Sequence, residues 1–304
     1  MTQYVNLDAA ETMFFERELE SVKSRTYDVI RAPLKAMELI PMSMDAGAGA
    51  ETITYQQFDM TGIAKIVGNY ADDLPRANVS GKEFTSRVKS IGNSFGYSLQ
   101  EVRAAQFAGR PLNDRLATAA ARAQREKWNQ LAFYGDEEHG IQGWLTNTNV
   151  PSSAVADGAS NETEWSTKTT DEILKDLNDA VTQIIDTTNG AEEPDTIVLP
   201  IAQYRLIATT RAADGTDTTI LQYFEANNPG VTVEWANELK GAFAGADGFI
   251  VYRRDPEAMT LELPQPFEML PVQERGLEYV VPCHSRFGGV IIYYPLSMAF
   301  KTGI

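Results

Sequence analysis

The sequence Thr52-Ile53-Thr54-Tyr55-Gln56-Gln57-Phe58 follows a Gly/Ala-rich link at 46–50 and is rich in residues that favour β-strands. The residues after it predict a turn at Asp59–Gly62, a returning strand at 63–67, a polar, turn-rich stretch at 69–80 and a further strand at 83–88. A ribbon of two strands buries too little apolar surface to be stable alone. We therefore expect the ribbon to lie on the rest of its own chain or on a neighbouring chain.

A long amphipathic helix is predicted after the ribbon, over about residues 114–134. Asn113 is a favoured N-cap residue and Gly135 a favoured C-terminal stop. Alanine and other apolar residues recur at helical spacing from Leu116 to Leu131. This alanine-rich face is expected to pack closely against a sheet or another helix.

The other predicted elements mix helices and strands, so the fold class is α+β. Thr169 and Glu172 have capping-box spacing at the start of one helix. Pro33 and Pro41 favour an extended arm over 26–44, and 146–168 is expected to be a loop. The predicted helices are 8–23, 171–187, 201–209 and 220–225, and the predicted strands are 196–199, 231–235, 249–252, 259–263, 279–281 and 289–294.

The composition restricts the class of partner. The chain has 42 acidic and 26 basic residues, a formal net charge of −16. Such a surface repels phosphates and anionic membranes, so gripping DNA is not expected to be the main role. The single cysteine, Cys283, cannot form an intrachain disulfide. No secretory start is visible, and the weakly polar run 287–300 is too short for a membrane span, so we expect a soluble protein made in the cytosol.

Candidate catalytic and metal-binding groups are sparse. Cys283, His284 and Ser285 are consecutive in a predicted strand, where neighbours point to opposite faces and cannot form a dyad. The acidic turn Asp136–His139 is either a solvated turn or, less favoured, a metal site. Neither GxxxxGK[ST] nor GxGxxG is present. We therefore predict no catalytic residue, no metal ligand, no cofactor and no enzymatic activity.

The order of these elements resembles the major capsid proteins of tailed bacteriophages, whose Hong Kong 97-type fold is shared with encapsulins. The resemblance covers essentially the whole chain and depends on arrangement together with local matches. Those matches are Ala71–Ala77 as the return leg of an extended loop, Phe95–Glu101 as the strand that enters the spine-helix region, Asn113–Gly135 as the spine helix, Gly140–Leu145 as the turn after it and Ser166–Thr188 as a second peripheral helix.

The resemblance implies a division of the chain into five parts. These are an N-terminal arm at 1–46, an extended loop (β-hairpin) at 47–82, a peripheral domain at 83–194 with its spine helix at about 114–134, an axial domain at 195–282, and a C-terminal strand at 283–304 that returns to the peripheral domain. Family members assemble as pentamers and hexamers into an icosahedral shell around double-stranded DNA. The extended loop of each subunit lies across a neighbour.

Candidate contact residues follow from this expectation. In the extended loop, we expect inter-subunit contacts at Tyr55, Lys65, Asp72, Asp73 and Arg76. On the spine helix, Arg115, Arg122 and Arg125 either contact an acidic neighbour or packaged DNA, or form an ordinary solvated face.

The implied partners are other copies of the chain, portal and decoration proteins, and packaged DNA bound without sequence specificity, with no membrane. The sequence leaves no room for a scaffolding segment before the arm, so scaffolding is expected to be separate or absent. Covalent crosslinking through Lys65 or Lys82 is not expected. The resemblance implies a virion location and synthesis in the bacterial host cytoplasm. An encapsulin-like cargo shell of the same fold is the first alternative, and a hydrolase or binding protein with an unrecognised site is the second.

Overall fold

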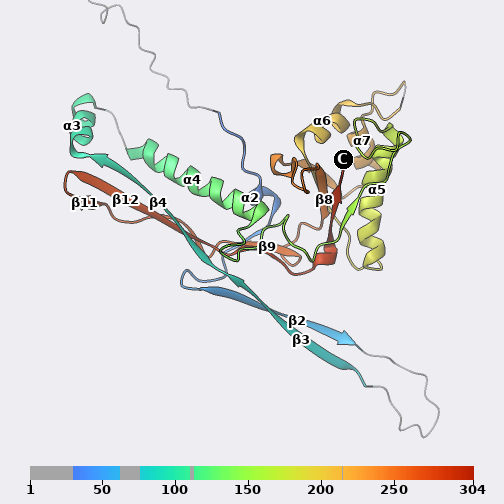
Figure 1. Ribbon diagram of the computed structural model, residues 1–304, viewed down its shortest axis with the longest axis horizontal. Helices are drawn as coiled ribbons and strands as arrows, with labels where there is room; N and C mark the ends of the chain where they lie inside the picture. Colours follow the sequence, from blue (N-terminus) through green and yellow to red (C-terminus); the bar gives the residue numbers. More distant parts are fainter. Residues whose placement is uncertain (1–29, 62–75, 110–112, 214) are drawn as a thin grey trace, which may run out of the picture. The chain divides into compact units, whose positions relative to one another are not determined.

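The computed structural model describes residues 30–61, 76–109, 113–213 and 215–304 (Figure 1). Contacts along the chain divide it into two units, Met1–Pro33 and Leu34–Ile304. In the first unit, the described residues 30–33 form neither helix nor strand. The predicted helix 8–23 and the predicted return strand 63–67 lie outside the described residues.

A long antiparallel sheet carries helix α4. Strand β12 (Glu278–Phe287) pairs along its whole length with β4 (Lys89–Ser98) and, on its other edge, with β10 (Gln265–Met269) and β11 (Gln273–Arg275). Helix α4 (Asn113–Tyr134) lies along β4 and β12 (Figure 1). The Trp128 indole donates a hydrogen bond to the buried Ser285 hydroxyl at 3.1 Å. This bond and the buried indole fix the predicted alanine-rich helix on the sheet.

A second sheet of five strands is buried on both faces. Its order is β5 (Ser152–Ala154), β14 (Met298–Thr302), β8 (Gly248–Tyr252), β6 (Thr196–Leu199) and β7 (Thr232–Trp235). In β8, Phe249 and Val251 join one apolar cluster while Ile250 and Tyr252 join another, because successive strand residues point to opposite faces. The first cluster contains side chains of α5 (Thr170–Thr187), α6 (Ile201–Thr209) and α7 (Ile220–Asn227).

A small third sheet joins strand β1, near the start of the second unit, to the core. Strand β1 (Met42–Ser43) pairs in parallel with β9 (Met259–Glu262), which pairs on its other side with β13 (Gly289–Ile292). The preceding helical turn α2 (Ala36–Leu39) buries Leu39, whose carbonyl accepts a hydrogen bond from the Tyr252 hydroxyl at 2.6 Å. The expectation of an extended arm over 26–44 is therefore wrong for Ala36–Leu39, which form a helical turn, and Ala36, Leu39 and Ile40 belong to the buried core.

The predicted ribbon is a two-stranded hairpin of β2 (Thr52–Thr61) and β3 (Asn78–Arg87). Neither strand pairs with another strand of the described chain, and the two run side by side in Figure 1. The predicted turn at Asp59–Gly62 is wrong, because Asp59, Met60 and Thr61 continue the ladder opposite Ser80, Val79 and Asn78. The polar stretch 69–80 likewise ends in strand from Asn78. Cross-strand pairing has overridden the weak strand propensity of these residues.

Two further predicted elements need correction. The strand expected through Glu101 stops at Ser98, where helix α3 (Leu99–Ala108) begins. The Ser98 hydroxyl accepts a hydrogen bond from the Glu101 amide at 3.2 Å, and the Glu101 carboxylate accepts one from the Ser98 amide at 2.8 Å, so the two form a capping box. The loop expected over 146–168 contains the short strand β5, which pairs with β14.

Most other predicted elements are confirmed within two residues at each end: helices 114–134, 171–187, 201–209 and 220–225 and strands 196–199, 231–235, 249–252, 259–263 and 289–294. The strand predicted at 279–281 is too short, because β12 continues to Phe287 along its pairing with β4. Helix α4 ends at Gly135, which has φ 67°, as expected for a C-terminal stop. A Cβ on Gly135 would lie 2.5 Å from the Gly143 amide nitrogen, so the turn that follows closes tightly on the helix end. Strand β3 continues to Arg87 and strand β12 begins at Glu278, so each crosses one of the domain limits expected at 82 and 282. Two short 3-10 turns, Asn237–Leu239 and Pro295–Ser297, complete the described elements.

A buried ion pair stabilises the start of α5. The Lys168 ammonium lies 2.5 Å from Asp176, and the two side chains are 1% and 4% exposed. The same carboxylate oxygen of Asp176 accepts a hydrogen bond from the Trp165 indole at 3.0 Å, and Lys168 donates to the Ala156 carbonyl at 2.7 Å. Each charged group is therefore both paired and hydrogen-bonded.

Replacing Asp176 by Asn should lower the free energy of unfolding by about 3–5 kcal/mol, because it leaves the buried Lys168 ammonium without a counter-ion. Adding Lys168→Met to Asp176→Asn should recover most of this loss, since the amide still accepts the Trp165 bond and no charge stays buried. Urea unfolding of the three proteins measures both changes. Equal losses in the single and double variants would contradict the role of the ion pair.

Candidate functional site

The hairpin is attached to the rest of the chain by an aromatic cluster at its root. The Tyr55 ring stacks on Phe84 of the opposite strand, with ring centroids 5.2 Å apart, and meets Tyr293 edge-on at 4.9 Å. On β3, the Ser86 hydroxyl donates a hydrogen bond to the Gly288 carbonyl at 2.9 Å. Tyr55, the first of the expected contact residues, therefore packs against its own chain at the point where the hairpin leaves it.

Burial raises the pKa of both tyrosine hydroxyls at this root. For Tyr55, burial is reinforced by the nearby Tyr293. For Tyr293, burial is reinforced by the Glu262 and Asp45 carboxylates and opposed by a hydrogen bond with Thr260. Both side chains are consequently neutral packing and hydrogen-bonding groups near neutral pH, and neither has the lowered pKa that a nucleophile requires.

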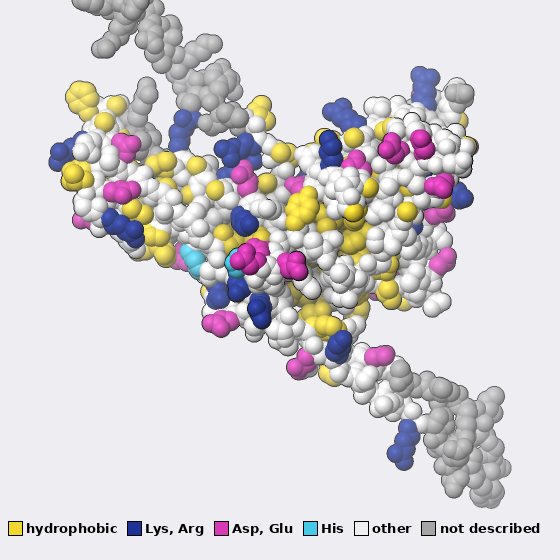
Figure 2. All heavy atoms as spheres, in the orientation of Figure 1, with side chains coloured by type: hydrophobic (Ala, Val, Ile, Leu, Met, Phe, Trp, Pro, Cys, Tyr) yellow, Lys and Arg dark blue, Asp and Glu magenta, His cyan; other side chains and the backbone are white. Residues whose placement is uncertain are grey.

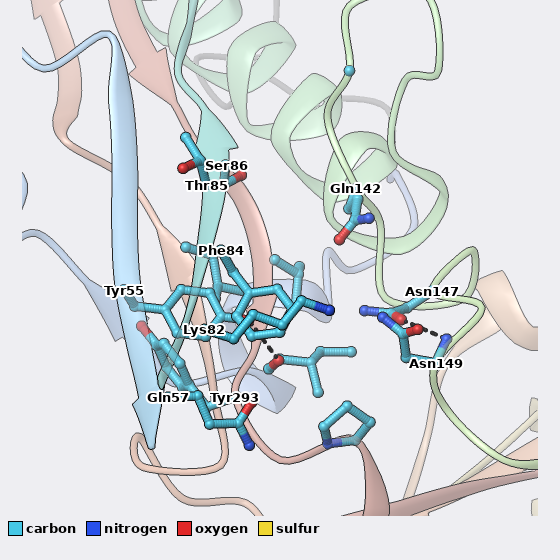
Figure 3. A pocket seen from close by; sticks show the side chains of 15 residues that line it. Tyr55, Gln57, Lys82, Phe84, Thr85, Ser86, Gln142, Asn147, Asn149 and Tyr293 are labelled. Carbon is cyan, nitrogen blue, oxygen red and sulfur yellow. Dashed lines mark hydrogen bonds between the residues drawn. The ribbon is translucent and has the colours of Figure 1, made fainter. Parts of the chain in front are cut away.

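A cavity of about 340 Å³ lies beside the cluster. Figure 3 shows Tyr55, Phe84 and Tyr293 on one side of it and the amides of Asn147 and Asn149 on the other. The Lys82 ammonium lies 4.9 Å from the centre of the Phe84 ring. The lining side chains of the described chain offer amides, hydroxyls and one cation, and they include no histidine, cysteine or carboxylate for acid–base or nucleophilic chemistry.

Apolar side chains are exposed along the hairpin beyond this root. Phe58, Met60 and Val79 are 59%, 80% and 58% exposed. Gly81 lies opposite Phe58, and a Cβ at Gly81 would be 2.8 Å from the Phe58 ring, so the ring covers the glycine backbone. The hairpin ladder also has polar cross-strand pairs, such as Gln56 with Glu83 at 2.7 Å. Its strands thus form a stable ladder, but the apolar groups on them have no cover within the described chain.

The other expected contact residues of the loop are not brought together by the described structure. Lys65, Asp72 and Asp73 lie outside the described residues. Arg76 is exposed just before β3. The expectation that these four residues contact a neighbouring subunit stays a prediction.

The expected arginines of α4 share one side of the helix. Arg115 and Arg122 are seven residues apart, about two helical turns, and Arg125 follows one turn later. Arg115 and Arg125 are exposed, whereas Arg122 is half-buried and its Nε lies 2.9 Å from Glu126. The charged face is therefore present, and its partner stays a prediction.

The candidate catalytic and metal-binding side chains predicted from the sequence do not form a reactive site in the described part of the chain. Cys283 and Ser285 are buried on the α4 side of β12, and burial raises the pKa of the Cys283 thiol. The Asp136 carboxylate lies 2.9 Å from Nδ1 of His139, and this hydrogen bond lowers the pKa of Asp136. Among the described residues, no three His, Cys, Asp or Glu side chains gather in a metal-binding arrangement. No helix of the described ranges is long and apolar enough to cross a membrane.

Further exposed apolar side chains were not predicted from the sequence. They lie on β10, in the loops between β10 and β12, and on α3: Met269, Leu270, Val272, Leu277 and Phe107. Phe107 alone is 95% exposed. Figure 2 shows hydrophobic side chains visible between charged ones on the face that it presents. The missed signal in the sequence is the apolar pattern Met269-Leu270-Pro271-Val272, which is too short for either a helix or a strand prediction.

Comparison with known proteins identifies relatives over nearly the whole chain. The family model described as "Major capsid protein" matches residues 62–304. The capsid of Myoviridae phage XM1 superposes with a TM-score of 0.81 at 20% identity, over 96% of this chain and 99% of that one. A virus-like particle protein from Pyrococcus furiosus gives a TM-score of 0.56 at 12% identity, over 87% and 91% of the two chains.

A curated relative is the type 1 encapsulin shell protein EncA of Myxococcus xanthus (strain DK1622). It is 25% identical over 142 residues, which is 46% of this chain and 48% of the relative. The match thus spans about half the length of that protein. The solved structures are less than 25% identical to this chain, so the similarity establishes a shared fold. That fold is of the Hong Kong 97 type, as expected from the order of elements.

Replacing Tyr55 by Ala should lower the free energy of unfolding by about 1–3 kcal/mol, because two aromatic contacts of about 0.5–1.5 kcal/mol each are lost. Tyr55→Phe keeps both ring contacts and should cost less than about 1 kcal/mol. Urea unfolding measures both values. A loss in Tyr55→Phe as large as that in Tyr55→Ala would show that the hydroxyl, rather than the ring cluster, holds the hairpin root.

Proposed function

Since this chain belongs to the major capsid protein family, we propose that its copies assemble as pentamers and hexamers into the icosahedral head of a tailed bacteriophage, enclosing double-stranded DNA. The single observation that carries this proposal is the β2–β3 hairpin. Two ten-residue strands pair only with each other within the described chain, and they present Phe58, Met60 and Val79 to solvent. The exposed apolar side chains of such a ribbon need a surface to pack against, and another subunit supplies it.

The division of labour along the chain is part of the proposal. Residues 1–46 act as the arm, 47–82 as the extended loop across a neighbour, 83–194 and 283–304 as the peripheral domain, and 195–282 as the axial domain around which subunits meet. Within the loop, Tyr55 sets the root, and Lys65, Asp72, Asp73 and Arg76 contact the adjacent subunit. Strands β6, β7 and β8 pair with one another and pack with α6 and α7 within residues 195–282, which supports a rigid axial domain of this kind.

The family and fold point to a structural role. We propose that the chain has no catalytic activity and takes portal, decoration and separate scaffolding proteins as further partners. Its net charge of −16 supports a wall that repels packaged DNA rather than one that grips it. Synthesis in the host cytoplasm and a final location in the virion follow from the same role.

A cargo shell of the encapsulin type is the second candidate. The match to a type 1 encapsulin shell protein over about half its length favours it. The two candidates differ in what the particle contains. Ultraviolet absorbance of particles purified from the natural source separates them, because packaged DNA gives a nucleic-acid spectrum and a protein cargo does not.

Truncating the hairpin beyond its root tests the proposed function. Residues 57–82 are replaced by Asn-Gly, which suits a two-residue turn between the paired residues Gln56 and Glu83 and leaves Tyr55 and Phe84 in place. The variant should stay folded, because the removed strands contribute little to the described core, and it should fail to form closed shells. Electron microscopy and circular dichroism measure assembly and folding.

The control is the full chain under the same conditions, which should form shells, capsomers or sheets. Normal closed shells from the truncated variant would contradict the role of the hairpin. A full chain that stays monomeric under all assembly conditions would contradict the shell function itself.

A further inference from the structure

A second groove lies on the other side of the hairpin root, between the root and the loops that precede β9 and follow β13. Its volume is about 830 Å³. Tyr55 and Tyr293 line it as well as the smaller cavity, so the two spaces flank the same aromatic cluster. Residues of β1 and the loop after it form a further wall.

The apolar part of this groove is unusually exposed. Met42, Met44, Phe58 and Tyr294 line it, and each is between 44% and 59% exposed. Methionine and aromatic side chains suit an adaptable contact with another protein surface. Within the described chain, these side chains are left partly open to solvent.

The charged part of the groove is entirely negative. Asp45 and Glu257 line it and are exposed, and none of the described residues that line it is Lys, Arg or His. Behind it, Glu262 is 3% exposed, and its carboxylate accepts hydrogen bonds from Thr260 at 2.7 Å and Ser43 at 3.2 Å. No ion pair joins Glu262 to a cation of the described chain. Two exposed carboxylates beside aromatic rings, with a third buried behind them, favour an occupant with cationic side chains.

The chain itself carries a surface of the complementary charge. The arginines of α4, Arg115, Arg122 and Arg125, lie on one side of the helix over about 15 Å, at 1.5 Å per residue. Arginine adds a planar group that stacks on aromatic rings as well as pairing with carboxylates. The methylene stems of arginine also suit the methionine-lined wall.

We propose that the acidic groove at the hairpin root of one subunit receives the arginine face of α4 from a second copy of this chain. The inference rests on the proposed function and names the two surfaces that meet when the hairpin lies across its neighbour. The contact is heterologous, since the groove of each subunit takes the helix of the next, and such contacts form rings when the rotation between subunits closes. Charge complementarity then fixes which neighbour is accepted and in what register.

Charge reversal on each surface tests the pairing. The groove variant is Asp45→Lys with Glu257→Lys, and the helix variant is Arg115→Glu with Arg125→Glu. A matched control, Glu162→Lys with Asp186→Lys, makes the same change in net charge as the groove variant at exposed positions outside the groove, helix α4 and the proposed axial domain. Circular dichroism and thermal unfolding confirm that each protein is folded, and sedimentation velocity with electron microscopy measures assembly.

Each reversed variant alone should lose large particles, and the matched control should keep them. Combining the groove and helix reversals in one chain should restore particles, because the reversed groove of each subunit then faces the reversed helix of the next, in pentamers as well as in hexamers. Loss of particles caused by damage to either surface alone would not be rescued in this way.

Three outcomes would overturn the inference. If the helix variant alone forms shells, the arginines of α4 contact DNA or solvent and not the groove. The groove would then be occupied by the N-terminal segment or another partner. Shells from the groove variant alone would show that the groove is not an assembly contact. A chain that carries both reversals and forms no particles would refute the pairing. Failure of the wild-type chain to assemble in the same assay would instead contradict the proposed function.

Discussion

A two-stranded ribbon has no other surface of its own to bury its side chains against, and the rest of this structure depends on that constraint. Strands β2 and β3 satisfy their backbone groups only along their shared edge, and both faces of the ribbon need something to lie on. The chain supplies that support at one end, through Tyr55, Phe84 and Tyr293. Beyond the root, exposed Phe58 and Met60 leave the remaining cover to another molecule. The body must therefore be rigid enough to hold an element that is completed elsewhere.

Two features provide that rigidity. Helix α4 is joined to β12 through Trp128 and Ser285, and the tight approach of Gly135 and Gly143 closes the turn after the helix. The five-stranded sheet has apolar clusters on both faces, and the buried pair of Lys168 with Asp176 at α5 is hydrogen-bonded to the Trp165 indole and the Ala156 carbonyl. A subunit built this way can present its hairpin, its acidic groove and its arginine-bearing helix in fixed relative register. Fixed register is what repeated identical contacts in a closed shell require.

The sequence predicts elements whose signals are local. Helix α5 is found from its capping box at Thr169 and Glu172, and α4 from its alanine periodicity and Gly135. The extent of the hairpin is not found, because Asp59 and Asn78 are weak strand formers that pair only because their partners are opposite them. The burial of α2 depends on Tyr252, more than two hundred residues later, and no local pattern encodes that contact.

The candidate site likewise combines features that a local sequence pattern predicts with features that depend on contacts between distant residues. The sequence singles out Tyr55 as an inter-subunit contact, which stays a prediction. Its packing against Tyr293 in the same chain, and the acidic groove between β1 and the hairpin, depend on tertiary contacts that no local pattern encodes. The most direct measurement of the central claim is hydrogen exchange of the β2 and β3 amides in dissociated subunits and in assembled particles. Strong extra protection of these amides on assembly, with little change in β12, is the result expected if a neighbour covers the hairpin. Equal exchange of the hairpin in both states would contradict it.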